Sequence, residues 1–177
     1  MDKNQYISEL YNELFEDVKC GGLADKYEFM TLTYDLLENE EFLALGNIKH
    51  HLHTSRLMHS LHVAYNSYYT CKKRDWDYKS VARGALLHDF FNVGNKNKNI
   101  PYRCLLGFCH PKMAMNKSLE HFELNYIEKN CILRHMFPMT IIPPKYKEAW
   151  MVILWDKIWG TRECFAFNRK FIVPVVA

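Results

Sequence analysis

The dipeptide His88-Asp89 constrains the fold most strongly, because it follows an apolar run over 81–87 and so carries a carboxylate toward the interior. An unpaired charge in an apolar interior costs several kcal/mol or more. Two buried carboxylates and four histidines are best explained together, by a metal cation that all of them bind. The fold is therefore expected to bring together six ionisable residues that lie in or beside apolar segments: His59, His88, Asp89, His110, His135 and Asp156.

The spacing of apolar residues favours helices along most of the chain, because they recur at i, i+3 and i+4. Pro143-Pro144 is expected to start the last strong helix and Gly160 to end it. No convincing strand pair is visible, although 171–176 is compatible with an extended conformation. The fold class is therefore expected to be all-α. The other predicted helices cover about 4–19, 29–37, 40–50, 57–69, 81–89, 110–122 and 126–136. Thr54 or Ser55 is expected to cap the fourth of these, and Asp75 or Asp77 the fifth.

The stretch Asn92–Phe108 interrupts this pattern, since asparagine, glycine and proline are frequent in it. A long loop inside a compact domain is often functional. His110-Pro111 is then expected to open a helix, because proline is favoured at the first helical position.

Length and composition limit the class of protein. A chain of 177 residues suits one domain with a full hydrophobic core. A net charge of +3 does not by itself indicate nucleic-acid binding, and none is expected. The longest apolar run, 149–155, is too short to span a bilayer. The six cysteines form no C-x-x-C pair and follow no secretion signal, which favours a reduced, cytoplasmic setting.

Each candidate ligand also has an ordinary structural interpretation. His59 has His62 at i+3, and only one of the two need face inward; either is compatible with a core histidine bonded to a carbonyl. Asp156 interrupts an apolar helix over 150–159, where an Asp–Arg or Asp–Lys core pair is the alternative. His135 near a helix end is also compatible with a favourable interaction with the helix dipole.

A structural zinc site is an alternative role for His110. Cys104, Cys109 and His110 form a C-x4-C-H pattern. This pattern lacks the paired knuckles of known zinc modules, so the cysteines are interpreted as ordinary buried thiols.

In chain order, the six residues resemble the ligand pattern of the HD superfamily of metal-dependent phosphohydrolases. The resemblance covers about residues 50–160. It implies one HD-type domain over 1–177, a helical bundle whose N-terminal helices, 4–50, pack on the HD core. The residues 54–56 and 135–140 also resemble an uncharacterised bacterial group of HD proteins. Three segments carry the likeness: Arg56-Leu57-Met58-His59-Ser60-Leu61-His62-Val63-Ala64, Gly84-Ala85-Leu86-Leu87-His88-Asp89 and Leu154-Trp155-Asp156-Lys157.

The resemblance also implies a ligand set. His59, His88, Asp89 and Asp156 would surround one ion, and Asp89 would bridge to a second. The extra histidines, His110 and His135, resemble the two-metal branch, which includes HD-GYP phosphodiesterases and symmetrical diadenosine-tetraphosphate hydrolases. The chain departs from HD-GYP proteins, since no GYP element is present and the lysine after the HD pair is displaced to position 96. This argues against cyclic-di-GMP as the substrate.

The expected function is hydrolysis of a nucleotide or another small phosphoester by metal-activated water, with Asp89 and Arg56 as catalytic residues. Mixed imidazole and carboxylate ligands suit iron, manganese or zinc. Arg56 lies one turn before His59 and is placed to hold phosphate, unless it is a surface or supporting arginine. Lys112 and Lys157 flank ligands, and solvated lysines are the favoured interpretation.

Two other functions use the same residues. Some HD folds carry di-iron oxygenases that resemble inositol oxygenase, and obligate iron and oxygen consumption would distinguish that chemistry. A non-catalytic HD module that binds a nucleotide is the third interpretation. The complete ligand set argues against it, since a binding module needs no full set of metal ligands.

Overall fold

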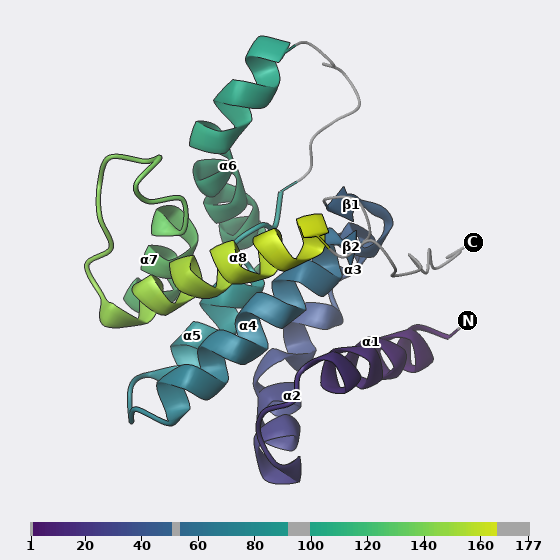
Figure 1. Cartoon of the computed structure of the whole chain (residues 1–177). Helices are drawn as coiled ribbons and strands as arrows, with labels where there is room; N and C mark the ends of the chain where they lie inside the picture. Colours follow the sequence, from purple (N-terminus) through teal and green to yellow (C-terminus); the bar gives the residue numbers. More distant parts are fainter. Residues whose placement is uncertain (1, 51–53, 92–99, 166–177) are drawn as a thin grey trace.

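The computed structural model describes residues 2–50, 54–91 and 100–165, and these form an all-α helical bundle, as predicted (Figure 1). A two-residue antiparallel strand pair, in which Lys49 pairs with Ser55, was not expected from the sequence. No helix in the described ranges is long and apolar enough to cross a membrane. The elements are α1 Lys3–Asp17, α2 Leu23–Leu37, α3 Glu40–Leu43, the 3-10 helix η1 Ala44–Asn47, β1 Lys49–His50, β2 Thr54–Ser55, α4 Arg56–Lys72, α5 Tyr78–Leu86, α6 Ile100–His121, α7 Tyr126–Arg134 and α8 Lys147–Phe165.

Helix α4 lies at the centre of the bundle, with α5 and α8 packed along it (Figure 1). Nearly all of its side chains are buried, which is the pattern of a helix enclosed on all sides. It starts where the Ser55 hydroxyl accepts a hydrogen bond from the Met58 amide at 3.1 Å. Asp77 caps α5 in the same way, through the Ser80 amide. The central position of α4 places His59 deep in the bundle.

Helices α1 and α2 cover one side of α4 with aromatic side chains. The rings of Phe29 and Tyr65 pack edge to face at 5.1 Å between centroids, and Phe29 is fully buried. At the far end of α4, Lys72 forms ion pairs with Asp25 and Glu28 of α2. The N-terminal helices therefore pack on the central helix.

Helices α5 and α7 approach closely at Gly84. A Cβ atom there would lie 2.9 Å from Cα of Glu128 and 3.0 Å from Cβ of Cys131. This contact matters for the site, because His88 and Asp89 follow α5 while His135 caps the C-terminus of α7.

Several predicted boundaries were wrong. Helix α2 begins at Leu23 rather than at 29. The helix over 40–50 is a short α-helix followed by a 3-10 turn and a strand. Helix α6 begins at Ile100, so part of the stretch predicted to be irregular is helical. Pro111 lies inside this helix, and Pro101 is the proline in its first turn.

Helix α8 also differs, since it begins at Lys147 rather than at Pro143-Pro144 and continues through Gly160 to Phe165. A single glycine within a helix lowers its stability by only about 1 kcal/mol relative to alanine. Residues on both sides of Gly160 are buried against the rest of the bundle. Trp159 and Glu163 are 3% and 4% exposed. The predicted loop residues 92–99 and the terminal segment 171–176 lie outside the described residues.

Candidate metal centre

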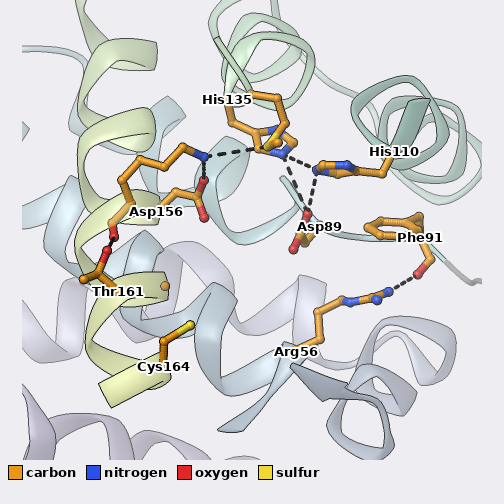
Figure 2. A pocket seen from close by; sticks show the side chains of 11 residues that line it. Arg56, Asp89, Phe91, His110, His135, Asp156, Thr161 and Cys164 are labelled. Atoms are coloured by element: carbon orange, nitrogen blue, oxygen red, sulfur yellow. Dashed lines mark hydrogen bonds and ion pairs between the residues drawn. The ribbon is translucent and has the colours of Figure 1, made fainter. Parts of the chain in front are cut away.

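Asp89, His110, His135 and Asp156 line one pocket (Figure 2). His59 and His88 lie beside Asp156 and Asp89, so the six predicted residues come together from five separate parts of the bundle. Their ligand atoms form two groups that share Asp89. In each group, the nitrogen and oxygen atoms lie within 4.8 Å of one another, which is close enough for one ion to contact all of them. The first group is His59, His88 and Asp89, and the second is Asp89, His110 and His135.

Asp156 of α8 adds a second carboxylate to the first group. Its Oδ1 atom lies 3.1 Å from Nε2 of His59 and 3.8 Å from Nε2 of His88. The same His88 nitrogen lies 3.8 Å from Oδ2 of Asp89. Two imidazoles and two carboxylates therefore face one position.

The second group is built around a close pair of imidazoles. The Nε2 atoms of His110 and His135 lie 2.7 Å apart. Both face Oδ1 of Asp89, at 3.4 Å and 3.7 Å (Figure 2). Asp89 thus turns one carboxylate oxygen toward each group, which is the arrangement of a bridging ligand.

Backbone carbonyls fix the ring orientation of two histidines. Nδ1 of His88 donates to the Ala85 carbonyl at 2.7 Å, and Nδ1 of His135 donates to the Ile132 carbonyl at 2.8 Å. Because a carbonyl only accepts, the proton of each neutral ring lies on Nδ1 and the lone pair on Nε2. Burial lowers the pKa of His88, and it lowers the pKa of His135 to about 3. Both rings are therefore neutral and present a lone pair to the site.

The Nε2 atom of His88 indicates whether a cation fits between the ligands of the first group. Among the residues that the structure describes, Nε2 of His88 has no hydrogen-bond partner, although the ring is 1% exposed. A buried polar atom that has no hydrogen-bond partner lowers the stability of the folded protein by about 1–3 kcal/mol. A metal ion would satisfy it, and mixed imidazole and carboxylate donors suit a divalent transition metal.

His59 differs from these two rings because both of its nitrogens meet carboxylates. Nε2 contacts Asp156, and Nδ1 lies 3.0 Å from Oε2 of Glu163. Burial lowers the pKa of His59, but the hydrogen bonds to the two carboxylates outweigh it and raise the pKa to about 10. Burial raises the pKa of Asp156, but His59 outweighs it and holds that pKa well below its usual range. Without a metal ion, a protonated His59 thus donates one hydrogen bond to each carboxylate.

Glu163 was not predicted from the sequence. It follows Asp156 by seven positions, about two helical turns, and so lies on the same face of α8. The predicted helix end at Gly160 placed Glu163 outside the helix. The seven-residue spacing of two acids in an apolar helix was the signal that could have found it.

Two cations line the same pocket, which has a volume of about 610 Å³. Arg56 donates from Nη1 to the Phe91 carbonyl at 2.6 Å, and its guanidinium lies 4.1 Å from the centre of the Phe91 ring. Lys157 lies 2.6 Å from Oδ2 of Asp156 and is half exposed. Figure 2 shows Arg56 below Asp89 and on the same side as Phe91. The pocket therefore combines acidic and imidazole ligands with positive charge suited to an anion.

Other candidates lie elsewhere. His62 is buried like its neighbour His59, but it pairs with Asp17 at 3.1 Å and stacks on Trp159. Lys112 is exposed, in line with a solvated lysine. Cys109 is also exposed, so its interpretation as a buried thiol was wrong.

The rival zinc site depends in part on Cys104, whose side chain lies outside the described residues. His110, which that site would use, faces Asp89 and His135. Comparison of the chain with models of protein families, with curated proteins and with solved structures finds no match.

Proposed function

We propose that the chain is a metal-dependent phosphohydrolase of the HD superfamily, with one domain over 1–177, that acts on a nucleotide or another small phosphoester. One observation carries the proposal: two groups of metal-ligand atoms share Asp89 in a pocket that Arg56 and Lys157 also line. A metal pair beside two cations suits a substrate that is an anion and gains negative charge in the transition state.

In this proposal His59, His88, Asp89 and Asp156 would hold a first ion, and Asp89, His110 and His135 would hold a second. Iron, manganese and zinc all suit this donor set. When bound, such ions lower the pKa of a coordinated water and neutralise charge on the phosphoryl oxygens. The buried carbonyl contacts of His88 and His135 keep their rings oriented for this role.

Arg56 and Lys157 have the complementary role of binding the phosphoryl group. The contacts with Phe91 hold the Arg56 guanidinium in place, and its Nε atom has no partner within the described part of the chain. A fixed guanidinium offers paired N–H donors that match phosphate oxygens. Attack of water breaks the P–O ester bond, and the cations oppose the negative charge that builds on the remaining oxygens.

The setting proposed for this reaction is the reducing cytoplasm. Cys20, Cys71 and Cys131 are thiols rather than halves of disulfides. Retention of thiols is typical of proteins that fold in a reducing compartment.

The test is a panel of nucleotides and phosphoesters, assayed for phosphate or nucleoside release with manganese, iron or zinc and with a chelator. The proposal expects turnover that vanishes with chelator, returns with metal and is lost in Asp89→Asn. Asp17→Asn is the matched control, because Asp17 also pairs with a buried histidine but lies outside the site.

Two results would contradict the proposal. Oxygen consumption that requires iron, without phosphate release, would favour the di-iron oxygenase. Tight binding of one nucleotide to the metal-loaded protein, without turnover of any substrate, would favour the non-catalytic module.

A further inference from the structure

Among the residues that the structure describes, Glu163 is the buried carboxylate beside the candidate metal centre that the proposed ligand set does not use. Its side chain is 5% exposed, and Oε2 lies 3.0 Å from Nδ1 of His59. The other nitrogen of the same ring, Nε2, faces the proposed ion and contacts Asp156. Glu163 is thus on the far side of His59 from the ligand position.

We infer that Glu163 is a positioning residue, which accepts the Nδ1 proton of His59 and so directs the Nε2 lone pair of this ring to the metal. The inference rests on the metal-binding part of the proposed function. It does not depend on which substrate is hydrolysed.

The reason lies in the two nitrogens of the imidazole ring. A neutral ring has one proton, and the ring binds metal only through the nitrogen that lacks it. A carboxylate on Nδ1 holds the proton there, fixes the ring plane and makes Nε2 a stronger donor. Backbone carbonyls accept the Nδ1 proton of His88 and His135, and the Glu163 carboxylate accepts that of His59.

The sequence positions of the two acids support a paired role. Asp156 and Glu163 project from one face of α8 and contact opposite nitrogens of His59. A carboxylate that is desolvated to this degree is costly unless it is paired. A contact with one ring nitrogen, on the side away from the pocket, is what an orienting residue requires.

The test uses Co²⁺ as the probe, with its affinity measured by titration and its visible absorption spectrum recorded. Glu163→Met keeps the length of the side chain but cannot accept the Nδ1 proton. We expect a 10- to 100-fold weaker affinity for the first ion and a changed spectrum. Glu163→Gln retains an amide oxygen that accepts this proton, so its affinity should lie between those of Glu163→Met and the wild type.

Glu148→Gln is the matched control. Glu148 lies on the same helix, is 4% exposed and accepts a hydrogen bond from the Asp77 amide, away from the metal centre. It should lower the melting temperature without changing the Co²⁺ affinity or spectrum. If Glu163→Gln and Glu163→Met bind Co²⁺ as the wild type does, the inference is wrong.

Failure of this inference and failure of the proposed function give different results. A wild-type protein that binds Co²⁺, loses affinity in Glu163→Met and hydrolyses no phosphoester supports the role of Glu163 and contradicts the hydrolase. A wild-type protein that binds no Co²⁺ overturns both.

Discussion

Arg56 has a place in both the fold and the pocket. It is the first residue of α4 and 8% exposed, yet it lines the pocket beside the proposed metal ligands. Burial lowers the pKa of Arg56, and the charge of Asp89 opposes this effect. A buried cation so near to the proposed ions is unfavourable unless an anion joins them. This agrees with a phosphorylated substrate.

Replacement of Arg56 by alanine should therefore raise KM or lower kcat about 10- to 100-fold without removing metal, since an ionic hydrogen bond contributes about 1.5–3 kcal/mol. Steady-state kinetics and metal analysis of the same preparation measure both effects. Arg56→Lys keeps the charge but loses the paired donors, and should recover only part of the activity. Loss of metal in Arg56→Ala would contradict this role and make Arg56 a support of the ligands.

The residues of the site were predictable where chemistry and local pattern agree. Asp89 and Asp156 stand out as acids in apolar helices, and both lie in the site. Glu163 did not stand out, because a glycine lies between it and Asp156 and the sequence alone does not reveal whether packing carries the helix past that glycine. Phe91 was not predicted as a site residue, yet its carbonyl and ring hold Arg56 in place.

At the scale of elements, the contact of α5 with α7 sets the distance between the two metal groups. Gly84 allows this contact, since a Cβ atom would collide with the backbone of Glu128. Gly84→Ala should lower the free energy of unfolding by about 1–3 kcal/mol. It should also weaken metal binding, because it moves His88 and Asp89 relative to His135.

Thermal melting and Co²⁺ titration measure these two effects of Gly84→Ala. The control is Gly107→Ala in α6, where a Cβ atom would meet only the flexible end of the Met139 side chain. It should leave the melting temperature nearly unchanged. Equal behaviour of the two alanine variants would show that the α5–α7 contact does not position the ligands.

The ion pairs between α2 and α4 predict a pH dependence of stability. Lys72 lies 2.8 Å from Asp25 and 2.5 Å from Glu28, and its hydrogen bonds lower the pKa of both carboxyl groups. In the unfolded chain the pKa values of these carboxyl groups are 3.8 for Asp25 and 4.5 for Glu28, and folding lowers both. The stabilisation by the ion pairs is therefore fully present above these values and is lost as the pH falls through the lower pKa values of the folded protein. Lys72→Met should therefore lower the free energy of unfolding by about 1 kcal/mol near neutral pH.

Urea unfolding at several pH values measures this effect. The difference between the wild type and Lys72→Met should shrink below about pH 4 as the carboxyl groups become protonated. Lys79→Met, at an exposed position of α5, is the control and should show little difference at any pH. A difference that stays constant down to pH 2 would contradict the ion-pair explanation.

The helices were predictable where apolar periodicity is strong, and their ends were less so. Helices α1, α4 and α7 follow the predicted ranges closely because each buries one or more regular apolar faces. The N-terminus of α6 was missed because Asn92–Phe108 lacks a regular pattern. Pro111 also misled the prediction, because a proline within a helix and a proline at its start look alike in sequence.

At the scale of the whole molecule, the fold assembles ligands that are far apart in the chain. His59 and Asp156 are separated by 97 residues and lie on two helices packed side by side. No single segment holds more than two ligands of the six, so the site exists only in the folded bundle. The proposed metal binding is therefore expected to be coupled to folding, and removal of a bound ion should lower the stability of the whole bundle.

The most direct test of this account is the metal content of the protein. The chain is stripped with a chelator, reloaded with manganese, desalted and analysed by elemental mass spectrometry, for the wild type, Asp89→Ala and the control Asp17→Asn. Because Asp89 is shared by both ligand groups, the account predicts about two ions in the wild type and in the control, and loss of both in Asp89→Ala. A wild-type protein that retains no metal, or an Asp89→Ala protein that retains as much as the wild type, would contradict it.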